Sequence, residues 1–420
     1  MIRRMLVLLI LSGVVIPFTS YAEGNISGKI FGESAGIYHP FLSLTHIYST
    51  NVFRTEEDTE AGLTNVITPG IWIALPRTRE KLLQVETSNT SPGGLSLSRT
   101  KPESFRRYQG YLFTDAEIRQ DPEESVANFK VNGFFQYNLR GGLSFDFVDQ
   151  FRNSHEPYGL GVTGNQDQYT SNLFQIMFSY GITEKIFIRT DYSNFQLSYS
   201  ESSVSYADRS DNILSGYVFY KIRPKIAVFS EIDYMDISYN TFKDNNSSEI
   251  RFLVGINWDI TVKSTGSFKT GIGSKNFKEK SNEDGSNMVL ELKLNHTFTP
   301  KTSLRLTLLR RNEETTIADT DYSLVNRLLT EYRQIINEKI TVNGKFHYSH
   351  ETYEGELDYS GTGNTEVRTD NRLGFSVGME YTFREWLTGQ ASYILNTRNS
   401  NIPEVGYTEN ALVLNIKGAL

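Results

Sequence analysis

The sequence of 420 residues contains no cysteine, and this absence removes several classes of protein. A chain without thiols forms no disulfide framework, has no thiolate metal site and carries no lipid on an N-terminal cysteine. Hydrophobic residues make up only 38% of the chain, and beyond its first residues no segment is apolar for long enough to form a transmembrane helix. Helical membrane proteins and disulfide-rich secreted domains are therefore excluded.

Positive charge and histidine are also scarce. The chain has 42 basic and 49 acidic residues, a formal net charge of −7, and six histidines. We find no glycine-rich phosphate loop and no basic-aromatic patch, so we expect no nucleic-acid partner. His347 and His350 are three residues apart, which places them on opposite faces of a strand. We expect no metal and no other cofactor, and, because no Ser-His-acid arrangement is recognisable, no catalytic residues and no enzymatic activity.

The first 22 residues have the features of an export signal. Arg3 and Arg4 precede an apolar run from Met5 to Ile16, and the segment ends in small residues before Glu23. This pattern predicts a secretory signal peptide over residues 1–22 that is cleaved after Ala22. We expect residues 23–38 to be a short periplasmic lead-in and residues 39–420 to form a single domain.

What the sequence does contain is a repeated alternation of apolar and polar residues. In the stretch Met288–Phe298, leucines at every second position alternate with residues such as Glu291 and Lys293. Because successive strand residues point to opposite faces, one face suits lipid and the other suits water. The pattern recurs at residues 143–147, 250–258, 304–308, 340–348, 373–381 and 412–420. It predicts an all-β fold, a transmembrane antiparallel β-barrel of the bacterial outer membrane.

The connections between these stretches alternate in length. Short turns are expected around residues 139–142, 183–185, 223–225, 299–301, 337–339 and 384–385, with longer polar loops between them. Short periplasmic turns and long outer loops are typical of outer-membrane barrels, whereas a soluble sandwich has no reason to alternate. We count about fifteen strands after Val126. Three more, at Phe41–Tyr48, at Leu63–Ala74 and somewhere between Leu82 and Phe113, give about eighteen, with sixteen or twenty as alternatives.

The water-facing sides of the strands carry charged residues that we expect to line the lumen. A barrel of about eighteen strands is too wide for wall side chains to fill, so the interior must hold water, a folded loop or a partner. Salt bridges within the wall are the alternative role for these charges. The predicted pore-lining residues are Lys130, Asp146, Arg251, Glu291, Lys293, Arg305, Lys345, Arg372 and Glu380.

Two N-terminal passages, FLSLTHIYSTNVFR (41–54) and VITPGI (66–71), resemble the "putative beta-barrel porin" family of the bacterial outer membrane that is associated with exopolysaccharide and capsule secretion loci. In that family a strand ends in Tyr-x-x-Asn-hydrophobic-aromatic, and the next strand opens with a Thr-Pro-Gly turn. The stretch Arg77–Lys101 departs from the family pattern as an insertion. The residues that match the motif are Tyr48, Asn51, Phe53, Pro69 and Gly70.

The resemblance implies a conduit for secreted exopolysaccharide or capsular polysaccharide that works with a periplasmic polysaccharide export protein. Inward aromatic residues such as Phe134, Tyr217 and Phe219 could then stack on sugar rings. The alternative is a general or solute-selective diffusion porin, constricted by the loop Asn153–Gln168. Further expected partners are outer-membrane lipid, lipopolysaccharide and the barrel assembly machinery. A surface adhesin or enzyme would need a cluster of functional residues at the rim, which the sequence does not show.

Overall fold

The computed structural model describes residues 37–75, 87–94, 107–159, 165–261, 263–279, 284–317, 320–355 and 366–419. The predicted signal peptide and nearly all of the predicted lead-in lie outside these ranges. No helix among the described residues is long and apolar enough to cross a membrane.

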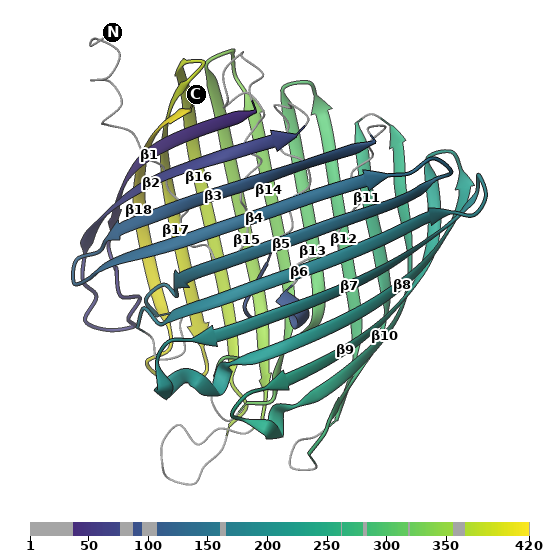
Figure 1. The fold of residues 1–420 in the computed structure, drawn as a ribbon. Helices are drawn as coiled ribbons and strands as arrows, with labels where there is room; N and C mark the ends of the chain where they lie inside the picture. Colours follow the sequence, from purple (N-terminus) through teal and green to yellow (C-terminus); the bar gives the residue numbers. More distant parts are fainter. Residues whose placement is uncertain are drawn as a thin grey trace.

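These residues form one antiparallel sheet of eighteen strands that closes on itself (Figure 1). Each strand pairs with its neighbours in the chain, and β1 pairs with β18, from Phe41 opposite Ala419 to Ser49 opposite Ala411. Closure leaves no unpaired strand edge, and the predicted count of eighteen is confirmed. The strands are β1 (Tyr38–Ser49), β2 (Gly62–Leu75), β3 (Tyr108–Gln120), β4 (Ser125–Asn138), β5 (Leu143–His155), β6 (Gln168–Gly181), β7 (Ile186–Tyr199), β8 (Arg209–Arg223), β9 (Ile226–Tyr239), β10 (Ser247–Thr261), β11 (Ser264–Phe277), β12 (Gly285–Thr299), β13 (Thr302–Glu313), β14 (Tyr322–Ile335), β15 (Ile340–Glu354), β16 (Thr369–Arg384), β17 (Leu387–Ser400) and β18 (Tyr407–Ala419).

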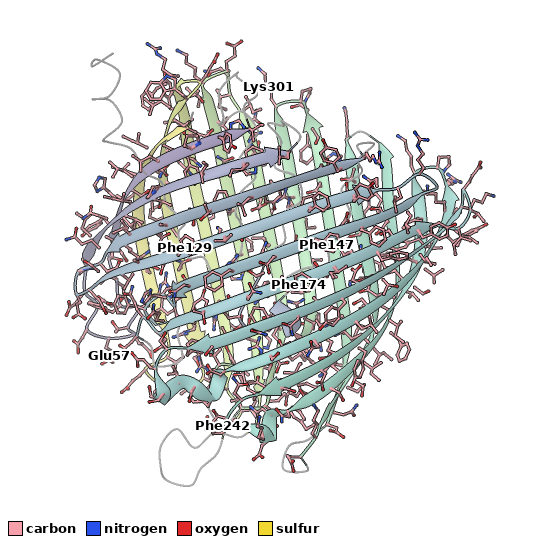
Figure 2. All side chains as sticks on the ribbon, viewed as in Figure 1. Glu57, Phe129, Phe147, Phe174, Phe242 and Lys301 are labelled. Atoms are coloured by element: carbon pink, nitrogen blue, oxygen red, sulfur yellow. The ribbon has the colours of Figure 1, made fainter. Side chains whose placement is uncertain are left out.

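The outer face of the wall is apolar, and the charged side chains of the strands lie mostly on the inner face, the reverse of a soluble protein. In β10, Phe252 and Val254 are each 63% exposed, whereas Arg251 and Leu253, which alternate with them, are 6% and 3% exposed. Phe129 and Phe147, on neighbouring strands of the wall, are also exposed (Figure 2). Exposed large apolar side chains on every second residue suit contact with lipid, and the buried charges face the interior.

The two ends of the barrel differ in their connections. At the end that holds the start of β1 and the end of β18, here named the turn end, most connections have two to four residues. Lys301 lies in one of these turns (Figure 2). In another, Gly141 and Gly142 have φ angles of 96° and 83°, which favour glycine. The opposite end, named the loop end, has connections of four to fourteen residues, and it includes Glu57.

One connection breaks this rule. β2 ends and β3 begins at the turn end, but they are joined by 32 residues, 76–107. The third strand was expected between Leu82 and Phe113; it runs from Tyr108 to Gln120 and overlaps that expectation only at its start. Its alternation is hidden in the sequence because both faces carry apolar residues: Leu112 is exposed, while Tyr111 and Phe113 are buried in the interior. The remaining residues of 82–107 are described only at 87–94 and 107.

Candidate functional site

Residues Thr87–Gly94, here named the luminal segment, lie inside the barrel. They belong to the connection between β2 and β3, and they end in the short 3-10 helix η2 (Pro92–Gly94), which is seen through the wall in Figure 1. The segment is a compact loop: Ser88 N donates to Gly94 O at 2.9 Å, and Gly94 N donates to Ser91 O at 2.8 Å. Although both flanking strands meet this connection at the turn end, the segment contacts residues near the loop end.

On one side the luminal segment is held by β8. The backbone N–H of Gly93 donates to Asp211 Oδ2 at 2.9 Å. The Arg209 guanidinium donates to the carbonyl oxygens of Asn89 and Ser91 and forms an ion pair with Asp211 at 3.1 Å. Both charged side chains are fully buried. The backbone of the segment therefore provides hydrogen-bond partners for two charged groups that have no contact with water.

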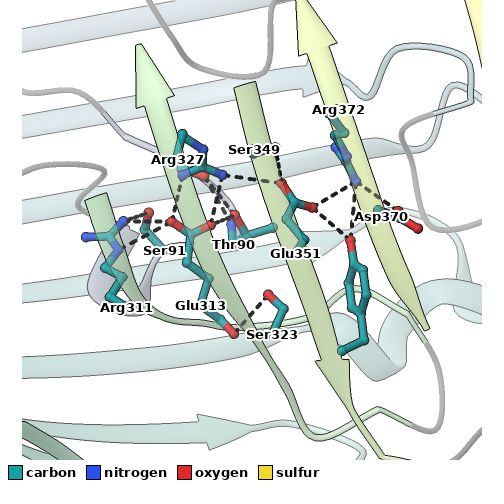
Figure 3. A network of polar contacts seen from close by, with 12 residues as sticks. Thr90, Ser91, Arg311, Glu313, Ser323, Arg327, Ser349, Glu351, Asp370 and Arg372 are labelled. Atoms are coloured by element: carbon teal, nitrogen blue, oxygen red, sulfur yellow. Dashed lines mark hydrogen bonds and ion pairs between the residues drawn. The ribbon is translucent and has the colours of Figure 1, made fainter. Parts of the chain in front are cut away.

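On the other side the segment is held by β13 and the residue that follows it (Figure 3). Thr90 Oγ1 donates to Glu313 Oε2 at 3.0 Å, and Arg311 Nη2 donates to Ser91 Oγ at 2.5 Å. The backbone N–H of Glu314 donates to Thr90 O at 2.6 Å. Because β8 and β13 are five strands apart around the wall, the segment bridges the interior near the loop end.

The tip of the segment can be built only from glycine. Gly93 and Gly94 have φ angles of 64° and 69°, a region that other residues rarely adopt. A Cβ atom at Gly93 would also overlap the side chain of Ile213, and one at Gly94 would overlap the ring of Phe195. The Pro-Gly-Gly sequence therefore lets the segment approach the β7–β8 wall closely enough to donate to Asp211.

Glu156, the first residue after β5, also holds the segment and gives it a pH dependence. Its Oε1 accepts from Asn89 Nδ2 at 2.8 Å and from the Tyr199 hydroxyl at 3.4 Å. Loss of solvent around this carboxyl raises its pKa from 4.5 to about 7; the hydrogen bonds from Asn89 and Tyr199 oppose this rise, and nearby Asp167 adds to it. Glu156 is thus largely protonated below neutral pH when the segment is docked.

We expect docking of the luminal segment to weaken as pH rises from about 4.5 to about 7. Because the pKa of Glu156 is higher when the segment is docked, docking is most favourable at a pH where this carboxyl is protonated in both the docked and the undocked state. The free energy of docking then becomes less favourable as pH rises from about 4.5, where the undocked carboxyl ionises, to about 7, where the docked carboxyl ionises. Single-channel conductance should therefore increase over this range and level off above it. The variant Glu156→Gln should keep the low-pH conductance throughout. An identical pH profile in both proteins would contradict this assignment.

A chain of ion pairs continues from the segment along the inner wall (Figure 3). Glu313 accepts from both Arg311 and Arg327 at 3.0 Å. Arg327 lies 3.7 Å from Glu351, which is 3.2 Å from Arg372. The network thus spans β13 to β16, and each of these carboxylates is shared between two arginines.

The nine predicted pore-lining residues all fall on the inward face of their strands. Asp146, Arg251 and Glu291 are buried, and the other six are partly exposed. The structure pairs several of them with acidic residues, of which the sequence singled out only Glu291. Lys130 lies 4.0 Å from Asp115, Arg251 2.6 Å from Glu249, Lys293 3.7 Å from Glu291, and Arg305 and Lys345 lie 2.9 and 3.4 Å from Glu331.

A signal for these partners is present in the sequence. Residues at i and i+2 of a strand lie on the same face, so an arginine and a carboxylate separated by one residue can pair. The structure shows this pairing repeatedly on the inner wall. The pairs are Arg119–Asp121, Arg189–Asp191, Arg209–Asp211, Glu249–Arg251, Arg311–Glu313 and Arg368–Asp370.

The residue types of the motif predict that Tyr48 and Phe53 anchor at the outer interface and that Asn51 takes a left-handed turn, but the structure shows this only for Tyr48. Tyr48 is exposed on the outer face, as an interfacial residue should be, but Phe53 packs on Tyr158 with ring centroids 5.0 Å apart. Asn51 is buried and ties the loop together by donating to Thr55 O and Thr408 O. In this loop the left-handed conformation falls instead on Arg54 and Asp58.

Pro69 and Gly70 lie in the middle of β2 and do not form a turn at its start. Proline cannot donate to a neighbouring strand, and the pairing of β2 with β3 is interrupted between Ile67 and Gly70. Gly70 is opposite Phe41, whose ring occupies the space that a Cβ atom would need. The motif therefore packs an inward aromatic ring against the wall.

The loop Asn153–Gln168 was the expected constriction, but its described residues mostly extend a strand or contact other segments. Its first residues extend β5 to His155, and Glu156 contacts the luminal segment. Tyr158 and Gly159 pack against the β1–β2 loop, and residues 160–164 lie outside the described residues. Among the residues that are described, the luminal segment bridges the lumen. No group of three or more His, Asp or Glu residues in the described ranges could hold a metal ion.

A closed barrel with an apolar exterior, a charged interior and a segment bonded within its lumen is an outer-membrane β-barrel of the porin type. The profile of the family described as "Putative beta-barrel porin 2" matches residues 172–420, more than half of the chain, and the protein belongs to this family. The matched region does not include the N-terminal motif.

Several solved structures are similar in outline. OccAB4 of Acinetobacter baumannii is 10% identical, with 92% of this chain and 99% of that chain covered and a TM-score of 0.44. OpdO of Pseudomonas aeruginosa is 8% identical, with 91% and 97% covered and a TM-score of 0.45. The siderophore receptor PirA of P. aeruginosa is 8% identical, with 91% and 80% covered and a TM-score of 0.41. Likenesses of this size do not bear on function. No curated protein sequence matches the chain.

Proposed function

We propose that this protein is a solute-selective diffusion porin integral to the bacterial outer membrane, with its turn end in the periplasm and its loop end outside. Membership of a porin family supports passive transport, and it supports a channel rather than an enzyme. The exposed apolar side chains of the wall support contact with outer-membrane lipid and lipopolysaccharide, and we propose the barrel assembly machinery as the partner that inserts the barrel in the cell.

The observation that carries this proposal is the luminal segment. A wall of eighteen strands encloses more space than its own side chains fill, so a further element must set the size of the passage. Thr90 and Ser91 reach β13 while Gly93 reaches β8, and these contacts narrow the interior near the loop end. Selection by size and charge at a narrowed point is how a porin discriminates between solutes.

The test is to reconstitute the refolded protein, residues 23–420, in planar bilayers and liposomes. We expect steady single-channel currents at low voltage, and swelling of liposomes in small neutral solutes that declines with solute size. A properly folded barrel that conducts no ions and admits no solute would overturn the proposal. The resistance of the folded barrel to unfolding in detergent at room temperature, seen as a shift on gel electrophoresis, serves as the check of folding.

A conduit for secreted polysaccharide is the second candidate function, and inward aromatic residues favour it. Phe41, Trp72, Tyr111, Phe113 and Phe134 form a packed cluster on the inner face of β1–β4, and aromatic rings can stack on sugars. The partners of this function would be the secreted glycan and a periplasmic polysaccharide export protein. Block of the current by the native glycan, but not by unrelated sugars of equal length, would favour it over the diffusion porin.

A further inference from the structure

A second group of arginines lies at the loop end, on the part of the wall formed by β13–β18. Arg54, in the β1–β2 loop, pairs with Glu409 at 2.9 Å. Arg368, the residue before β16, pairs with Asp370 in that strand at 2.7 Å. Together with the network of Figure 3 this group, here named the arginine cluster, has six arginines and four carboxylates. Its members are Arg54, Arg311, Arg327, Arg368, Arg372, Arg398, Glu313, Glu351, Asp370 and Glu409.

The arginine cluster has a net charge of +2. One excess charge is on Arg398, and the other is shared by Arg311, Arg327 and Arg372, which have only Glu313 and Glu351 between them. The Arg398 guanidinium donates to the carbonyl oxygen of Val405 at 2.7 Å and lies over the ring of Tyr407. Among the described residues no carboxylate lies within 4.0 Å of it. Arg54 lies over the same ring, so Tyr407 separates two like charges and does not neutralise either.

The arrangement places like charges close together on an accessible surface. Arg398 lies directly opposite Arg372 in the pairing of β16 with β17, so the two like charges are adjacent on the inner face. The Arg372 side chain is 20% exposed; its Nη2 donates to the Tyr353 hydroxyl and pairs with Glu351, whereas its Nη1 has no hydrogen-bond partner among the described residues. Arg54 and Arg368 are covered and fully engaged with their carboxylates. Arg372 and Arg398 therefore offer unused donors toward the lumen.

We propose that Arg372 and Arg398 form a binding site for the oxyanion of a solute, a carboxylate or a phosphate, at the outer mouth of the lumen. The planar guanidinium presents paired N–H donors that match the two oxygens of such a group. An arginine cluster that served only to stabilise the wall would have one carboxylate for each arginine. The Arg209–Asp211 and Arg189–Asp191 pairs elsewhere in the barrel have this composition. The bound anion supplies the charge that the carboxylates leave unmatched.

This inference rests on the proposed function, because a solute must enter the lumen to reach the site. It is tested with Arg398→Gln, which keeps a donor for Val405 O but removes the charge. The matched control is Arg310→Gln. Arg310 is also close to the loop end, but it belongs to the outer face and bonds to Asn326. Both variants lower the net charge of the protein equally.

Two measurements separate anion binding at the site from conduction through the channel. Binding of inorganic phosphate and of succinate to the detergent-folded barrel is measured by equilibrium dialysis, which requires no conduction. We expect Arg398→Gln to bind about tenfold more weakly than the wild type, as for loss of one charge-assisted hydrogen bond, and Arg310→Gln to bind like the wild type. In bilayers, the anion-to-cation permeability ratio should fall in Arg398→Gln alone. Arg398→Lys should retain the permeability ratio and lose part of the binding.

Equal binding by the wild type and Arg398→Gln would overturn the proposed site even if the protein conducts ions. Conversely, phosphate binding that depends on Arg398 in a barrel that conducts nothing would support the site and overturn the porin. Phosphate binding without succinate binding would assign the site to phosphate groups, which lipopolysaccharide also carries. In that case purified lipopolysaccharide should compete with phosphate if its headgroup is the natural source, and should have no effect if a free solute is.

Discussion

Removal of Ser88–Gly94 should raise the single-channel conductance severalfold. These residues contact β8 and β13 across the interior, so their loss reopens the narrowed part of the lumen. The point variant Gly93→Val should also raise the conductance. The valine side chain would overlap Ile213 and displace the backbone N–H that donates to Asp211. Liposome swelling should extend to larger solutes in both variants.

The matched control for Gly93→Val is Gly141→Val. Gly141 also has a positive φ, but it lies in a turn and a Cβ atom there meets no other atom within 4 Å. Both substitutions strain the backbone by a similar amount, of order 1 kcal/mol, but only the first disturbs the lumen. Unchanged conductance after deletion of the segment would show that it does not limit the passage.

The second large effect concerns stability. Lys275 and Glu314 form an ion pair at 2.7 Å in which both side chains are fully buried. Glu314 also accepts from the Tyr239 hydroxyl at 3.0 Å, and its backbone N–H holds Thr90. Lys275→Met leaves a carboxylate without its cation in the interior, which costs about 3–5 kcal/mol. We expect this loss in the free energy of unfolding by urea in phospholipid vesicles.

The exposed ion pair between Lys278 and Asp236 provides the control. It has the same separation of 2.7 Å, but its side chains are 44% and 34% exposed. Lys278→Met should therefore change the free energy of unfolding by no more than about 1 kcal/mol. The double variant Lys275→Met, Glu314→Gln should recover much of the stability lost in the single variant. If Lys275→Met and Lys278→Met destabilised the protein equally, burial would not be the cause.

The sequence predicted the barrel well because period-two alternation is a local property. β10 and β12 could be traced residue by residue, and the turns at the turn end followed from their polar residues. β3 was misplaced because Tyr111 and Phe113 make its inward face as apolar as its outward face. Where alternation fails, a single sequence offers no other guide to register.

The candidate site was less predictable because it depends on contacts between distant parts of the chain. The inward charges could be identified, but Ser91 lies 220 residues from Arg311, and no local pattern connects them. The Pro-Gly-Gly tip resembles an ordinary turn until Ile213 and Phe195 are seen against it. The excess charge of the arginine cluster likewise appears only when loop and strand residues are assembled around Tyr407.

The path of the luminal segment also has a mechanical consequence. The hydrogen bonds of a barrel wall run around its circumference, so they resist stretching of the ring but offer little resistance to flattening. A brace that is bonded to β8 on one side and to β13 on the other opposes flattening along that diameter, where membrane lateral pressure would act. The cross-section should therefore stay rounder at the braced end, and the seam between β1 and β18 should bear less shear there.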